Sequence, residues 1–320
     1  MTSHPMSVGA LLPRDLPARD LPAFVRDTEA LGFDELWVVE DCFFRGGIAQ
    51  AAVALATTST LRVGVGILPA AARNVAFEAL ELGTLAELYP GRLVAGVGHG
   101  MPGWMRQVGA WPASALTLLE EHLTALRSLL HGEEVTTHGR YVRLDAVRLE
   151  SPPAVPPPVL AGVRGPRSLA VAGQRADGVV LAEPGTPAYV RAAREQAGGG
   201  AGLRVVAYEV AAVDDDAAVA RDRARVALRW VGEADAAAHL VGLPFAEELT
   251  ELCARHADVA AFAAALPDAW VDELAVVGTP EDARRRLGDL SSAGADAVVL
   301  LPAGPDPLAA LHSLARVLPA

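Results

Sequence analysis

The stretch of residues 61–100 constrains the fold most, because it carries two apolar runs on either side of one helical pattern. The first run, 62–68, stops at a proline, and the second, 93–97, stops at Gly98-His99-Gly100. The helical pattern between them covers residues 74–88. This order predicts a βαβ unit with parallel strands, and strands that are apolar on both faces are typical of a parallel sheet covered by helices. Such sheets carry their chemistry at the carboxyl ends of the strands.

The same pattern recurs along the rest of the chain. Further apolar runs predict strands at residues 8–12, 35–39, 159–161, 178–181, 203–210 and 297–301. Helical patterns follow most of them, and eight such units predict a (β/α)8 TIM barrel of the α/β class, although an open doubly wound sheet would accommodate seven of the eight. We therefore expect one barrel domain over residues 1–320. We also expect two short strands within 135–148, an irregular loop at 101–112, and a helical, alanine-rich insertion at about 232–270.

Composition excludes several classes of function. The chain of 320 residues has a formal net charge of −12 and no basic stripe, which argues against a nucleic-acid partner. All 27 basic residues are arginine, so a lysine Schiff base and the Gly-Lys of a P-loop are both excluded. We expect no membrane partner, because no apolar stretch has the length of a membrane span. The start of the chain does not resemble a signal peptide, and two cysteines cannot form a disulfide framework, so we expect a cytoplasmic protein.

The sequence Gly98-His99-Gly100-Met101-Pro102-Gly103 formally matches the dinucleotide-binding pattern G-x-G-x-x-G. Pro102 should break the helix that such a site requires, so we do not favour that interpretation. We expect instead that the glycines let a flat ligand lie against the end of the strand. His99 is the histidine at the end of a predicted strand, and it is the best-placed general acid or base, with a structural role as the alternative.

A second loop, residues 162–167, follows a short predicted strand and opens a helix. It reads Gly162-Val163-Arg164-Gly165-Pro166-Arg167. The backbone N–H groups of a first helical turn, together with arginines, bind anions such as phosphate, and the later strands of TIM barrels often carry such a site. The alternative is an ordinary connection with two surface arginines.

Two neighbouring acids, Glu40 and Asp41, follow the predicted strand at 35–39. Neighbouring carboxyl groups at a strand end are suited to acid–base chemistry. The alternative is a salt bridge to Arg45 or Arg73. The remaining histidines show no metal-binding spacing, and we expect no metal.

Several short sequences occur together in the order found in one known superfamily. They are GFDELW at 32–37, RVGVGILP at 62–69, Arg73-Asn74, YPGR at 89–92, Gly96-Val97-Gly98, Gly165-Pro166, ADGV at 176–179 and the helix start Thr279-Pro280-Glu281. With this series the chain resembles the bacterial-luciferase-like superfamily, and within it the deazaflavin (coenzyme F420)-dependent oxidoreductases related to methylene-tetrahydromethanopterin reductase. The resemblance implies a (β/α)8 barrel with a flavin or deazaflavin ring across its mouth and a non-prolyl cis peptide at Gly66-Ile67 behind the ring.

The resemblance also implies site residues. Together with the loop described above, the candidate cofactor-binding residues are Gly66, Ile67, Leu68, Gly98, Gly162, Val163, Arg164, Gly165, Pro166, Arg167, Leu181, Ala182 and Glu183. Arg14, Arg45 and Arg73 are candidates for holding the acidic tail of F420. Relatives often carry Asp-His after the second strand and a glutamate after the fourth, where this chain has Glu40-Asp41 and His99, so its proton chemistry is expected to differ.

These observations lead to one expected function and two alternatives. We expect an oxidoreductase that transfers a hydride between coenzyme F420 and a small organic substrate, with His99 as the proton donor or acceptor and Asp41 or Glu40 assisting. The alternatives are an FMN-dependent monooxygenase on the same barrel and a family member that binds a cofactor without catalysis. Members of the family are commonly dimers, and the helix at 74–88 offers apolar faces for a homodimer interface.

Overall fold

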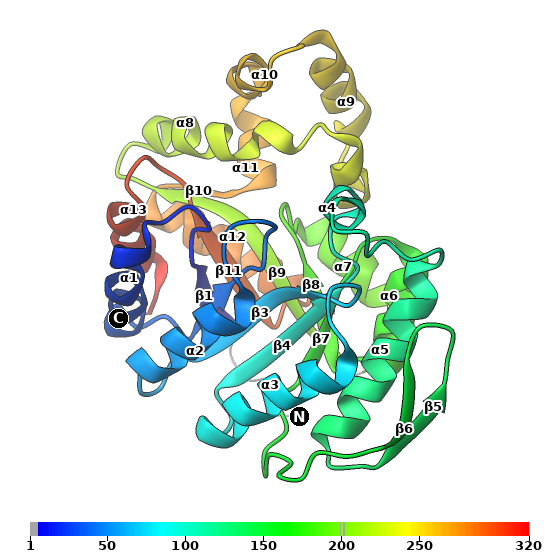
Figure 1. Ribbon diagram of the computed structural model, residues 1–320. Helices are drawn as coiled ribbons and strands as arrows, with labels where there is room; N and C mark the ends of the chain where they lie inside the picture. Colours follow the sequence, from blue (N-terminus) through cyan, green and yellow to red (C-terminus); the bar gives the residue numbers. More distant parts are fainter. Residues whose placement is uncertain (1–5, 199, 201, 320) are drawn as a thin grey trace.

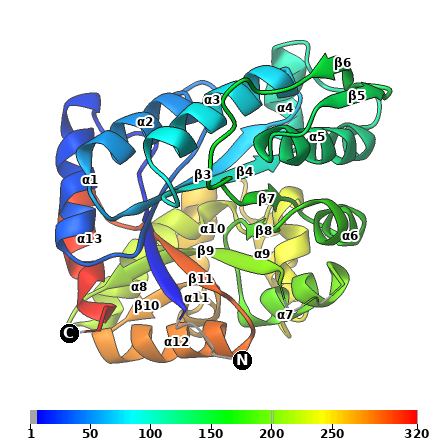
Figure 2. The same ribbon diagram turned by 90° about the horizontal axis from the view of Figure 1, so that it is seen from below.

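A closed barrel of parallel strands forms the centre of the computed structural model, which describes residues 6–198, 200 and 202–319 (Figures 1 and 2). In barrel order the strands are β1 (Ser7–Leu11), β2 (Glu35–Val38), β3 (Arg62–Pro69), β4 (Leu93–Gly98), β7 (Val159–Gly162), β8 (Gly178–Leu181), β9 (Arg204–Val213) and β11 (Ala297–Pro302). The pairing of β8 with β9, in which Leu181 lies opposite Ala207, closes the ring. The predicted barrel is therefore confirmed, and the open sheet is excluded.

Helices surround the barrel and follow its strands. They are α1 (Leu21–Ala30), α2 (Gly47–Thr57), α3 (Val75–Leu88), α5 (Ala115–Leu130), α6 (Pro166–Arg175), α7 (Pro187–Gln196), α12 (Pro280–Ser292) and α13 (Pro307–Leu314), with short 3-10 turns at η1 (Ala18–Asp20) and η4 (Ala315–Val317). Side-chain capping explains where several of these helices begin. The Asn74 side chain accepts a hydrogen bond from the Ala76 amide at the start of α3, and Thr279 and Asp282 form a capping box at the start of α12.

The segment between β9 and β11 carries additional helices, which lie beyond one end of the barrel at the top of Figure 1. They are α8 (Ala217–Ala227), η2 (Leu228–Trp230), η3 (Ala234–Leu240), α9 (Ala246–Arg255), α10 (Val259–Ala265) and α11 (Asp268–Leu274). The structure adds a strand that the sequence did not predict, β10 (Val276–Gly278), which pairs with the far end of β9. A run of three residues is too short for a periodic signal.

Two shorter features lie between β4 and β7. The predicted pair of strands is present as β5 (Val135–His138) and β6 (Arg143–Val147), which pair antiparallel. The predicted irregular loop at 101–112 is wrong in part, because α4 (Pro102–Gln107) begins within it. Pro102 occupies the first turn of this helix, where a missing N–H costs nothing, so the proline begins a helix that we expected it to break.

Buried side chains fill both sides of the barrel wall. One large core joins the outer faces of the strands to the helices, and a smaller apolar cluster fills the lumen. The lumen cluster consists of Trp37, Val94, Leu160, Val180, Val206, Tyr208, Ala297 and Val299, with Leu11 and Leu301 packed against it. A third core lies beneath the additional helices. Across the described residues, none of the helices combines the length and the apolar character that crossing a membrane requires.

Candidate active site

A bulge in β3 marks the carboxyl end of the barrel. The register between β3 and β4 shifts between Val65 and Leu68, and the Gly66–Ile67 peptide bond in the bulge is cis, as the resemblance implied. The bulge directs the Ile67 side chain over the neighbouring strands. A Cβ at Gly162 would lie 2.2 Å from Ile67 Cγ2, and a Cβ at Gly98 would lie 3.2 Å from Ile67 Cδ1. Gly162 therefore makes room for Ile67, whereas a Cβ at Gly98 would first meet the Gly162 carbonyl oxygen, at 2.4 Å. The contact of a flat ligand with Gly98 stays a prediction.

Two aromatic side chains close the lumen below the bulge. Trp37 from β2 and Tyr208 from β9 are both buried, and their rings meet edge to face with centroids 5.7 Å apart. Two glycines of β3 admit them: a Cβ at Gly64 would lie 2.3 Å from the Trp37 indole, and a Cβ at Gly66 would lie 2.0 Å from Tyr208 Oη. The Trp37 indole N–H donates to Glu35 Oε2 over 2.9 Å. Sequence reasoning missed Tyr208, because strands β9 and β3 are far apart along the chain.

His99 follows β4 at the same end of the barrel, as predicted. Its Nε2 lies 3.0 Å from the Ser168 hydroxyl, which belongs to the first turn of α6. The imidazole is partly buried, and this burial lowers the pKa of His99 below 6.5. A neutral imidazole beside a hydroxyl can accept or donate a proton. The sequence places Ser168 directly after the loop 162–167 but did not pair it with His99, because nothing in the spacing connects residues 99 and 168.

The loop 162–167 has the geometry of an anion site. Gly165, with φ of +76°, precedes α6, Pro166 occupies the first turn, and no side chain caps the helix. The first-turn N–H groups of a helix lack intrahelical partners, and the helix dipole adds a partial positive charge. Arg164 and Arg167 are exposed, and Arg164 Nη1 donates to the Asp235 carbonyl over 2.8 Å. This contact ties the loop to η3.

The acids after β2 form ion pairs. Arg73 donates to both carboxylate oxygens of Glu40, one of them over 2.7 Å, and Glu40 Oε2 also accepts from the Gly47 amide over 2.7 Å. The Glu40 carboxylate thereby provides a hydrogen-bond acceptor for the Gly47 N–H in the first turn of α2. Asp41 pairs with Arg14 over 2.7 Å, and both side chains are partly exposed. These contacts favour the salt-bridge alternative for Glu40, whereas Asp41 stays accessible; a catalytic role for either remains a prediction.

The three arginines that we considered for an acidic tail have partners within the chain. Arg14 and Arg73 hold Asp41 and Glu40. Arg45 donates to the carbonyls of Arg14 (3.2 Å) and Leu16. An acidic ligand must therefore share or displace these contacts.

The segment after β8 contributes Leu181, Ala182 and Glu183. Leu181 is fully buried in the outer core, Ala182 is half-buried, and Glu183 is exposed. The Glu183–Pro184 bond is cis, and the Gly185 amide then bonds the Tyr208 carbonyl over 3.0 Å. Ala182 and Glu183 follow the carboxyl end of β8, the same end of the barrel as the bulge. Their contact with a cofactor stays a prediction.

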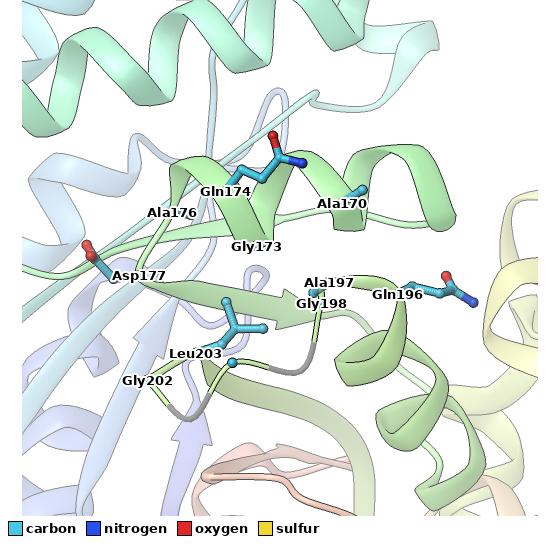
Figure 3. A pocket seen from close by; sticks show the side chains of 11 residues that line it. Ala170, Gly173, Gln174, Ala176, Asp177, Gln196, Ala197, Gly198, Gly202 and Leu203 are labelled. Carbon is cyan, nitrogen blue, oxygen red and sulfur yellow. The ribbon is translucent and has the colours of Figure 1, made fainter.

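A cavity lies at the other end of the barrel. Its volume is about 500 Å³, and it is lined by the carboxyl ends of α6 and α7 and by residues that precede β8 and β9, including Asp177 and Leu203 (Figure 3). Because it adjoins the amino ends of the strands, it is separate from the site that we describe. Within the described residues, we find no cluster of three or more His, Cys, Asp or Glu side chains that could hold a metal ion.

The residues around the mouth fit a flat cofactor that carries an anionic group. Ile67 and Tyr208 pack at the bulge, and the uncapped start of α6 is suited to an anion. The Tyr208 hydroxyl is buried without a partner among the described residues, as expected for a group that bonds a ligand. His99 lies at the same end of the barrel, and its role in proton transfer stays a prediction.

Comparisons with known proteins agree with the barrel fold. The family described as luciferase-like monooxygenase matches residues 2–297. The chain is 26% identical to the 5,10-methylenetetrahydromethanopterin reductase of Methanolobus tindarius over 302 residues, which cover 91% of this chain and 92% of the relative. Its fold matches the F420-dependent tetrahydromethanopterin reductase of Methanopyrus kandleri with a TM-score of 0.82, 20% identity and 97% of both chains covered. It also matches an F420-dependent secondary alcohol dehydrogenase in complex with an F420–acetone adduct, with a TM-score of 0.78, 22% identity and 98% of both chains covered.

Proposed function

The chain belongs to the luciferase-like monooxygenase family, and on that premise we propose that it is an oxidoreductase that transfers a hydride between coenzyme F420 and a small organic substrate. One observation carries the choice of cofactor: the matching curated relative is a reductase, and two F420-dependent enzymes match the fold with higher TM-scores (0.82 and 0.78) than the monooxygenases that also match it (0.68–0.72). F420 supplies the hydride chemistry when bound, and the protein supplies binding, orientation and proton transfer.

We assign the binding of the cofactor to two parts of the mouth. The bulge with Gly66, Ile67 and Leu68 backs the ring, together with Gly98. The loop 162–167 and the residues Leu181, Ala182 and Glu183 hold the phosphate, because the uncapped α6 start and the arginines favour negative charge there.

The proton chemistry falls to His99, with Asp41 assisting. His99 lies at the end of β4 and is partly accessible, so it can reach a substrate in the mouth. Its contact with Ser168 fixes the orientation of the imidazole. Glu40 is the weaker candidate, since its carboxylate already accepts hydrogen bonds from Arg73 and from the Gly47 amide. We expect Glu40 to hold the loop after β2 in position rather than to transfer a proton.

A fluorescence titration with F420 and, separately, with FMN tests this proposal. We expect micromolar binding of F420 and much weaker binding of FMN, followed by F420-dependent conversion of a small organic substrate. Preference for FMN would instead support the monooxygenase alternative, with oxygen consumption as the next measurement. Binding of neither cofactor would contradict the proposed function.

We also propose that the protein forms a homodimer through α3. Phe77, Leu80 and Leu88 on this helix are exposed, with 68%, 55% and 64% of their surface accessible, and large apolar side chains exposed on one helix suit a contact between subunits. Light scattering should give the mass of two chains, and Leu80→Asp should shift it toward one; the mass of one chain in the wild type would contradict this proposal.

A reducing compartment such as the cytoplasm suits the free Cys42 and Cys253.

A further inference from the structure

Tyr208 reaches across the lumen from β9 to the bulge of β3. Alternation along β9 turns Val206 and Tyr208 into the lumen, whereas Val205 and Ala207 face the helices. Only 4% of the Tyr208 surface is accessible. Its Oη occupies the place that a Cβ would take at Gly66, at 2.0 Å from the ideal position, so the hydroxyl touches the backbone of the bulge.

Packing does not explain the hydroxyl group. Its oxygen is fully covered and has no hydrogen-bond partner among the described residues. A phenylalanine would fill the lumen against Trp37 equally well without a buried polar atom, which is unfavourable when unpaired. Buried polar groups without partners are rare in native proteins, and each one requires an explanation.

The surroundings of the hydroxyl keep it protonated. Burial raises the pKa of Tyr208 well above 10, and the negative charges of Glu183, Glu35 and Asp41 raise the pKa further. A phenol that cannot ionise remains available as a donor. A donor at the floor of the mouth, next to the bulge that backs the ring, needs an acceptor on the ligand.

A second buried tyrosine, Tyr189, provides a control for the effect of removing a buried hydroxyl. Tyr189 on α7 has 2% of its surface accessible, and its hydroxyl also has no partner among the described residues. Its ring packs against His239 of η3, with centroids 4.7 Å apart, outside the lumen. Tyr189 therefore shares the chemistry of Tyr208 but not its place at the bulge.

We infer that Tyr208 is a further cofactor-binding residue, whose hydroxyl donates a hydrogen bond to an oxygen or nitrogen acceptor of the flat heterocyclic ring at the bulge of β3. This inference rests on the proposed function, because it requires a ring at that place. The lumen position explains why β3 carries a glycine at position 66: any side chain there would displace the donor.

Tyr208→Phe tests the inference through ligand binding and stability together. Without ligand, the midpoint of thermal unfolding should stay the same or rise, because an unpaired buried hydroxyl has been removed. The Kd for F420 should rise about 2–13-fold, the range for one lost hydrogen bond, and the absorption maximum of bound F420 should shift. Tyr189→Phe is the matched control: its stability should change in the same direction, with Kd and absorption as in the wild type.

Three outcomes would overturn the inference. If the wild type binds F420 and Tyr208→Phe binds it with the same Kd, this inference is overturned and the proposed function is not. A lower unfolding midpoint of the ligand-free variant would show that the hydroxyl serves the fold. If the wild type binds FMN instead, the same comparison is made with FMN, whose ring also carries carbonyl oxygens. Binding of neither ring by the wild type overturns the proposed function, and this inference with it.

Discussion

Replacement of His99 by alanine is expected to lower the turnover number about 10²–10⁴-fold, the range that a positioned general acid or base contributes. The imidazole lies at the carboxyl end of β4, partly accessible, with Nε2 3.0 Å from the Ser168 hydroxyl. Within the described part of the chain, His99 contacts a single hydroxyl, whereas the Glu40 carboxylate accepts hydrogen bonds from Arg73 and from the Gly47 amide. The loss should therefore appear in turnover, while the Kd for F420 changes little. Steady-state kinetics with F420 and a substrate found by screening, combined with the binding titration, measures both.

The pH profile of kcat/KM separates a catalytic role of His99 from a structural one. Burial lowers the pKa of His99 below 6.5, so the neutral imidazole predominates at pH 7. If the neutral form accepts the proton, the wild-type rate falls only below this lowered pKa, and His99→Ala lacks that acidic limb. His138→Gln, at an exposed histidine of β5, should keep both the rate and the limb. Full turnover in His99→Ala would show that another group moves the proton.

Much of the barrel could be predicted because its signals are local. Each strand is a run of apolar residues that is buried on both faces, and such runs are visible in the sequence without knowledge of their partners. The caps at Asn74 and Thr279 are also local, since each acts within three residues. The start of α4 at Pro102 shows the limit of this reasoning, because proline either breaks a helix or begins one, and only the surrounding backbone decides.

The site could be predicted less completely, because its contacts join distant parts of the chain. The bulge at Gly66 followed from the resemblance to a family, not from the residues themselves. The contact of Gly98 and Gly162 with a cofactor stays a prediction. In the structure, the space beside Gly162 is filled by the Ile67 side chain and the space beside Gly98 by the Gly162 carbonyl, each from a different strand. Ser168 beside His99 and Tyr208 beside Gly66 have no sequence spacing that could reveal them. The ion pair of Glu40 with Arg73 was recognised only as an alternative, and the partner of Asp41, Arg14, was not among the arginines considered for it.

Acid is expected to destabilise the protein through His239, by up to about 5 kcal/mol between pH 6.5 and pH 3. His239 in η3 is fully buried, and neither ring nitrogen has a hydrogen-bond partner among the described residues. Burial, together with the positive charge of Arg164, lowers the pKa of His239 to about 3. The unfolded chain, with the ordinary pKa of 6.5, binds a proton below that pH while the folded chain does not. The free energy of unfolding therefore falls as the pH falls, at about 1.4 kcal/mol per pH unit at most.

Denaturant unfolding of the wild type and of His239→Phe at a series of pH values isolates this effect. Phenylalanine can pack against Tyr189 without a titrating group, so the difference in the free energy of unfolding between the two proteins should grow in favour of the variant as the pH falls from 6.5 toward 4. The buried Glu209, whose pKa burial raises to about 8, acts in the opposite direction, since its contribution weakens the fold as the pH rises from 4.5 toward 8. It is present in both proteins and cancels in the difference. Parallel curves for the two proteins would show that His239 is protonated or solvated in the fold, and that η3 does not pack as described.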